Sequence, residues 1–218
     1  MNATVEVGGA RLHLLAGKAA WWPAERTLLV ADAHIGKAVS YRRLGVPVPE
    51  ATTGGTLDAL DALFARHDAQ RVVFLGDLLH SAHAHARDTL AAFAQWRAQR
   101  GAVEMVLVRG NHDDRAGDPP PSWGVQCVDE PFWLAAAPQL ALCHHPKPID
   151  KAYVLAGHLH PCTTIGRGID RLRLPCFHFG PSVGVLPAFG VFTGMHAIDR
   201  APGDQVFVVA DNALHQLP

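Results

Sequence analysis

The segment VEMVLVRGNHD at residues 103–113 decides the fold, because a run of apolar residues changes abruptly into Gly, Asn, His and Asp. A short apolar run with such an ending predicts a buried strand that delivers polar side chains at its carboxyl end. The same arrangement occurs in TLLVADAH at 27–34, RVVFLGD at 71–77, QLALCHH at 139–145 and YVLAGHLH at 153–160. In open α/β sheets ligands bind outside the carboxyl ends of the strands, so we expect these polar endings to meet at one site.

Helical patterns separate the first three of these strands. Apolar residues recur at spacings of three and four over residues 57–64 and again over 90–96, which gives each helix one apolar stripe. In the second half of the chain, apolar segments broken by Gly and Pro, such as 171–180 and 205–211, predict further strands. We therefore expect residues 1–218 to form a single α/β domain in which two mixed sheets face each other with helices outside them, a four-layer α/β/β/α sandwich.

Composition narrows the class of protein. The 218 residues are 49% apolar and 18% charged, which predicts an ordered globular chain. A net charge of -1 excludes a basic field over the whole molecule, although a local basic groove for nucleic acid stays open. The sequence has no long apolar span, no basic flank typical of a secretion signal and no C-x-x-C unit among its 4 cysteines. These features predict a cytoplasmic protein with no membrane partner and with buried thiols.

The polar endings contain residue types that bind hard and borderline metal ions. They are Asp32-x-His34, Gly76-Asp77, Gly110-Asn111-His112-Asp113, His144 and Gly157-His158-x-His160. Because residues two apart in an extended segment point to the same side, we expect both members of each D-x-H or H-x-H pair to face one cavity. Two divalent cations about 3.5–4 Å apart need a bridging carboxylate, for which Asp77 is the natural candidate. Mixed carboxylate, amide and imidazole ligands suit Mn²⁺.

Taken in order, these blocks resemble the calcineurin-like metallophosphoesterase superfamily over residues 27–160. The resemblance implies a metallophosphoesterase fold and two sets of metal ligands. One set would be Asp32, His34, Asp77 and His160, and the other Asp77, Asn111, His144 and His158. It also implies that His112 lies beside the metals without binding them, where it would stabilise the transition state or protonate the leaving oxygen, and that Asp113 orients His112. Asn111 and His112 would add hydrogen bonds to the developing charge.

A narrower resemblance covers nearly the whole chain. The segments DAHIGKA, GDLLHS, RGNHD, LAGHLHP and VLPAFGVFTG are similar to those of the ligase-associated DNA-damage-response endonucleases called PdeM. This resemblance implies a manganese-dependent endonuclease that cuts single-stranded DNA in repair, with helicase or ligase partners. The expected mechanism is direct hydrolysis by a hydroxide that bridges the two ions, without a covalent intermediate.

Two other functions remain open from the residues alone. The metal motifs equally fit a phosphodiesterase or phosphatase that acts on small molecules or nucleotides, since substrate choice depends on the rim of the site. A binding scaffold on the same fold would need missing ligands, and none of the expected ligands is missing.

Several positions carry alternatives. In the CHHP segment the metal ligand is either His144 or His145, and strand alternation favours His144. The cations Lys37, Arg42 and Arg43 either contact substrate phosphates or lie on a solvated helix face. His80 either lines the mouth of the site or faces solvent.

Aromatic residues are candidates for stacking on unpaired bases. Trp21, Trp22 and Phe177 are the three that we consider, because aromatic side chains hold single strands in this way. For Phe177, burial in the core is the favoured interpretation.

Overall fold

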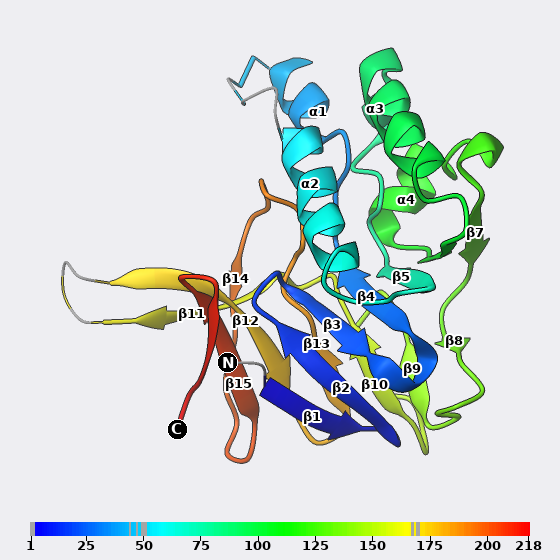
Figure 1. The fold of residues 1–218 in the computed structure, drawn as a ribbon. Coiled ribbons are helices and arrows are strands. Elements are labelled where there is room, and N and C mark those ends of the chain that lie inside the picture. Colours follow the sequence, from blue (N-terminus) through cyan, green and yellow to red (C-terminus); the bar gives the residue numbers. More distant parts are fainter. Residues whose placement is uncertain (1–2, 44, 47, 49–51, 167, 169–170) are drawn as a thin grey trace.

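Two β-sheets face each other, and helices gather on one side of them (Figure 1). The computed structural model describes residues 3–43, 45–46, 48, 52–166, 168 and 171–218. No helix in this described part is long and apolar enough to cross a membrane. All four cysteines are free thiols, and only Cys127 is not fully buried.

The first sheet contains seven strands in chain order. They are β1 (Ala3–Val7), β2 (Ala10–Leu15), β3 (Ala19–Trp22), β4 (Thr27–Ala31), β5 (Arg71–Leu75), β6 (Glu104–Val108) and β7 (Val125–Val128). Short turns join β1 to β4 as antiparallel neighbours, whereas the crossovers between β4, β5, β6 and β7 make these strands parallel. The sheet is therefore mixed, and the carboxyl ends of β4, β5 and β6 lie side by side.

The helices pack on the outer face of this sheet (Figure 1). They are α1 (Lys37–Arg43), α2 (Thr52–Phe64), α3 (Arg87–Ala98) and α4 (Asn111–Ala116), with 3-10 turns η1 (Pro23–Glu25), η2 (Ala82–His85) and η3 (Pro121–Trp123). Alternation along β4 places Leu28 and Val30 against Leu60 of α2, with Phe93 of α3 in the same cluster. Both predicted helices are confirmed, and their apolar stripes face the sheet except at Ala94, which is exposed.

The second sheet is also mixed. Its strands are β8 (Phe132–Trp133), β9 (Leu140–Leu142), β10 (Tyr153–Ala156), β11 (Pro161–Ile165), β12 (Leu172–Phe179), β13 (Val183–Val185), β14 (His196–Ala197), β15 (Gln205–Ala210) and β16 (Ala213–Gln216). β10 runs parallel to β9 and β13, and β12 runs antiparallel to β13 and β15. The inner faces of the two sheets share one core, in which Leu29 and Val73 join Leu155 and Phe177. The predicted metallophosphoesterase fold of two facing mixed sheets is confirmed.

The outer face of the second sheet differs from the expected helical layer. All α-helices of the described residues end before Gly117. Ile149 and Ala152 cover β9 and β10 from a loop, while Ile198 and Leu217 cover β12 and β15. The second half of the sequence lacks a helical period, so loops bury the apolar face that helices were expected to cover.

Candidate metal centre

The site lies at the ends of five strands, of which β4, β5 and β6 belong to the first sheet and β9 and β10 to the second. Asp32 and His34 follow β4, Asp77 follows β5, and Asn111 begins α4 after β6. His144 follows β9, while His158 and His160 follow β10. The structure brings together all seven residues that the sequence proposes as metal ligands.

One group of donors consists of Asp32, His34 and His160. Their ligand atoms all lie within 4.8 Å of one another. The Nε2 atoms of His34 and His160 are 3.2 Å apart, and His160 Nε2 lies 3.7 Å from Asp32 Oδ1. Asp77 adjoins this group, because its Oδ2 lies 3.9 Å from His34 Nε2.

A second group forms around His144. Its Nε2 lies 3.0 Å from Asn111 Oδ1 and 3.0 Å from His158 Nδ1. The same nitrogen is 3.6 Å from Asp77 Oδ1. Asp77 therefore turns one carboxylate oxygen toward each group, as a carboxylate shared between two ions would have to do.

The protonation pattern of the imidazoles fits a bound cation. His144 donates from Nδ1 to the Leu75 carbonyl at 3.2 Å, and His160 donates from Nδ1 to the Gly194 carbonyl at 3.0 Å. In each neutral ring Nε2 then carries a lone pair. The lone pair of His144 faces the Asn111 oxygen, which is also an acceptor. Two hydrogen-bond acceptors that face each other in a buried site cannot bond to each other. Their lone pairs are therefore free to bind a divalent metal ion.

Burial controls the charge of these groups. Desolvation is the main cause that lowers the pKa of His34 far below its ordinary value, and it also lowers the pKa of His144. Burial raises the pKa of Asp77 to about 6, against the hydrogen bond from the His112 amide, and the nearby Asp32 adds to the rise. Neutral imidazoles and two crowded carboxylates form an environment that a cation stabilises.

The backbone at the site is in an unusual conformation. Left-handed φ values occur at Asp32 (52°), His34 (47°), Asp77 (51°), His158 (71°) and His160 (49°). Residues with a β-carbon rarely adopt such values, which cost on the order of 1 kcal/mol or more each. The members of the D-x-H and H-x-H pairs thus converge from strained turns beyond the strands, and the expected extended geometry is wrong.

Two motif glycines provide space for the ligands. A β-carbon on Gly76 would lie 2.0 Å from His144 Nδ1, and one on Gly110 would lie 2.4 Å from Asp77 Oδ1. Gly76 also has a left-handed φ of 77°. The glycines that precede Asp77 and Asn111 are therefore required by close packing against the donors.

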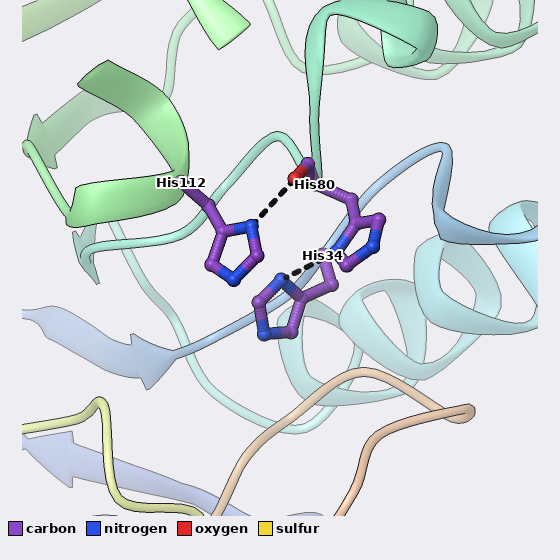
Figure 2. Close-up of side chains that lie close together, drawn as sticks. All are labelled: His34, His80 and His112. Carbon is purple, nitrogen blue, oxygen red and sulfur yellow. Dashed lines mark hydrogen bonds between the residues drawn. The ribbon is translucent and has the colours of Figure 1, made fainter. Parts of the chain in front are cut away.

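His112 lies beside the donors and is held by a backbone carbonyl. Its Nδ1 donates to the backbone oxygen of His80 at 2.6 Å (Figure 2). Its Nε2 lies 4.0 Å from Asp77 Oδ2. The His80 ring stacks on the His112 ring with centroids 4.9 Å apart, and His80 Nδ1 lies 3.4 Å from His34 Nδ1 (Figure 2). His80 thus lines the site and does not simply face solvent.

Asp113 supports the site differently from the expectation that it orients His112. Its carboxylate is buried and accepts hydrogen bonds from the amides of Leu79, at 2.9 Å, and Gly110, at 3.0 Å. Burial raises its pKa to about 7. Asp113 therefore joins the turn after β5 to the turn after β6, and His80 takes the orienting role that we assigned to Asp113.

Glu130 is a supporting residue that the sequence did not indicate. One of its carboxylate oxygens accepts the amides of His144, at 2.8 Å, and His145, at 2.9 Å. The other lies 2.8 Å from His145 Nδ1. This pairing holds His145 at Glu130, while the His144 ring points into the donor groups. No motif surrounds Glu130, so only the fold reveals its position.

The candidate substrate contacts separate along α1. Lys37 is buried and lines a small cavity with His34 and Phe192. Arg42 is half-buried and Arg43 is exposed, both at the far end of the helix. Burial lowers the pKa of Lys37, although Asp32 and Asp77 oppose this effect.

The aromatic residues proposed for base stacking lie elsewhere. Phe177 is fully buried between the sheets, in agreement with the favoured interpretation. Trp22 is buried in the same core, and the Trp21 ring contacts His67. Trp21 and Trp22 are not at the site because they belong to β3, which lies between β2 and β4 inside the first sheet. The exposed aromatic ring at the site is instead that of Phe192.

Comparison with known proteins agrees with this geometry. Residues 25–182 match the family model described as calcineurin-like phosphoesterase. The crystal structure of the nuclease MPE of Pseudomonas putida is similar to this chain, with 44% identity, a TM-score of 0.86 and coverage of 100% of both chains. The E. coli phosphoesterase Yfce is 15% identical, with a TM-score of 0.41 over 88% of this chain and 97% of that chain. No curated protein sequence matches. This chain therefore belongs to the calcineurin-like phosphoesterase family of metal-dependent hydrolases that act on phosphoester bonds.

Proposed function

We propose that this protein is a manganese-dependent endonuclease that hydrolyses phosphodiester bonds of single-stranded DNA. The observation that carries the proposal is the position of Asp77, whose two oxygens face two separate donor groups in one buried site. Similarity to a nuclease over the full length of both chains supports a nucleic acid as the substrate.

The proposed ligands follow the two donor groups. Asp32, His34, Asp77 and His160 would hold one ion, and Asp77, Asn111, His144 and His158 the other. Bound divalent ions supply charge neutralisation at the phosphate and a more acidic water. His144 is preferred over His145 because His144 Nε2 faces Asn111, whereas His145 Nδ1 is paired with Glu130.

His112 is the proposed proton carrier. Because its Nδ1 proton is bonded to the His80 carbonyl, a second proton would reside on Nε2. Nε2 is the nitrogen that faces Asp77, at 4.0 Å. A leaving oxygen next to the donor groups would therefore meet the transferable proton of His112.

The cellular role that we propose follows the resemblance of the sequence to the ligase-associated repair endonucleases. A single domain in the cytoplasm would act on DNA during repair, with a helicase or ligase as partner. Lys37, Arg42 and Arg43 would contact phosphates that flank the scissile one, with Lys37 nearest the donors.

The test uses circular single-stranded DNA, which has no ends for an exonuclease. Manganese-loaded protein is incubated with this circle, with a chromogenic phosphodiester and with a chromogenic phosphomonoester. We expect the circle to be cut and the diester to be hydrolysed. Turnover of the chromogenic substrates alone would replace the proposal with a small-molecule phosphoesterase, and silence on all three substrates would contradict hydrolysis by this chain.

A further inference from the structure

A short segment beside the donor groups exposes apolar side chains. Residues 190–195, here called the rim segment, precede β14 and contact α1 through Tyr41 and α2 through Thr56. Val191 is 51% exposed, Phe192 40% and Met195 41%. Exposed apolar groups that cluster at the mouth of a site indicate a binding surface.

The backbone of the rim segment is bonded to the metal centre. Gly190 donates to the Asp32 carbonyl at 3.2 Å, and the Gly194 carbonyl accepts from His160 at 3.0 Å. From the other side, Lys18 Nζ donates to the Gly190 carbonyl at 3.2 Å. The segment is therefore fixed in place relative to the donors, so its exposed side chains form a preorganised surface.

A row of rings connects the rim segment to His112. The Phe192 and Tyr41 rings meet edge to face with centroids 5.8 Å apart, and Tyr41 lies 5.9 Å from His80. His80 in turn stacks on His112. Lys37 Nζ lies 5.7 Å from the Tyr41 ring centroid, so a cation accompanies the row of rings.

We propose that Phe192, supported by Tyr41, stacks on an unpaired nucleobase next to the scissile phosphate and thereby selects single strands. The inference rests on the proposed nuclease function and names the residues that choose its substrate. Stacking requires a free base face, and paired bases in a duplex have theirs covered by neighbours. The row of rings ends at His112 and runs beside Lys37, so a base held there would place its phosphate near the catalytic groups.

The test compares Phe192→Ala with Phe192→Trp and with the control Leu172→Ala. Leu172 is 59% exposed on β12 and is outside the rim segment. We expect Phe192→Ala to raise the KM for a single-stranded oligonucleotide about 10-fold, the usual scale for loss of one stacked base. The ratio of its activity on the oligonucleotide to its activity on a chromogenic diester without a base falls by the same factor. Phe192→Trp restores the ratio, and Leu172→Ala leaves it at the parent value.

A second readout does not depend on turnover. Fluorescence anisotropy measures the binding of a labelled oligonucleotide to the 218-residue chain in EDTA, with folding checked by circular dichroism. We expect Phe192→Ala to weaken binding about 10-fold, and one abasic position in the oligonucleotide to reduce the difference between variant and parent.

The possible failures are distinguishable. If the parent hydrolyses the diester and cuts no DNA, the nuclease proposal fails, and the stacking inference fails with it. If the parent cuts DNA and Phe192→Ala binds and cuts it equally well, the stacking inference alone is overturned. A parallel loss on both substrates would show that Phe192 only maintains the site, and the rim segment would then be open to other partners, such as a protein.

Discussion

The metal centre and the rim segment lie side by side and are built by opposite means. Asp32, Asp77 and His144 are buried, and hydrogen bonds to backbone groups fix the orientation of Asp32 and His144. In the rim segment the backbone is bonded, while the side chains of Val191 and Phe192 are exposed. The difference teaches that the fold fixes the chemistry with buried donors and leaves the choice of substrate to a few exposed side chains.

The largest effect is expected from Asp77→Asn, which breaks the shared donor. An amide cannot present two anionic oxygens, so we expect both ions to be lost. Turnover should fall below about a thousandth of the parent, beyond the 10- to 100-fold cost of losing a supporting partner. Metal content by mass spectrometry and turnover of a chromogenic diester provide the measurements. The control is Asp58→Asn, an exposed carboxylate on α2. Retention of two ions by Asp77→Asn would contradict the shared role.

His112→Ala tests whether chemistry and metal binding separate inside the centre. His112 contributes a proton and hydrogen bonds without serving as a proposed ligand, so metal content should stay at the parent value. Turnover should fall about 10²- to 10³-fold. The matched control His83→Ala removes an exposed histidine from η2. A loss of metal by His112→Ala would reassign the residue to the ligands.

Gly110→Ala sharpens the packing argument. The added methyl would lie 2.4 Å from Asp77 Oδ1 and must displace that carboxylate. We expect metal affinity to fall about 10- to 100-fold, as it does when an outer partner of a ligand is lost. Isothermal titration with Mn²⁺ measures the change. Gly101→Ala is the control, because a β-carbon there meets no atom within 4 Å. Equal affinity in both variants would remove the packing role of Gly110.

The sequence predicted the residues of the buried metal centre well. Apolar runs that end in Asp, Asn and His identified the strands and the donor residues, because burial and metal ligation each restrict residue type. It predicted the wrong local geometry, since the left-handed φ of Asp32 or His158 leaves no mark in a pattern of two-residue alternation. It also gave Asp113 a partner that it does not have.

The rim could not be predicted in the same way. Phe192 lies in the segment GVFTG, which has neither strand alternation nor a helical period. Its position depends on backbone hydrogen bonds to Asp32 and His160, residues far away in the sequence. Trp22 and Phe177 have the same aromatic character and are buried in the core. Residue type alone therefore does not distinguish a base-stacking ring from a core ring.

The smallest effect on turnover is expected from Asp204→Asn, far from both regions. Asp204 accepts from His178 Nε2 at 2.7 Å and from the Ala201 amide at 2.9 Å, and so joins the turn before β15 to β12. Burial alone would raise the pKa of Asp204, but these hydrogen bonds hold it below its ordinary value. Because the folded pKa is depressed, the Asp204 carboxylate stabilises the fold at any pH above the unfolded pKa of 3.8. This stabilisation is lost as the pH falls from 3.8 through the lower pKa of the folded state.

Asp204→Asn should therefore lower the free energy of unfolding by about 1–2 kcal/mol at pH 7, with turnover unchanged. The difference from the parent should shrink as the pH falls below the unfolded value of 3.8. Urea denaturation followed by tryptophan fluorescence at several pH values measures both effects, and Asp199→Asn, an exposed neighbour, is the control. A fall in turnover at constant metal content would connect the His178 hydrogen bond to the site. Asp204 would then affect turnover as well as stability, contrary to this prediction. The connection would run through β14, which directly follows the rim segment and so could link the turn before β15 to Phe192.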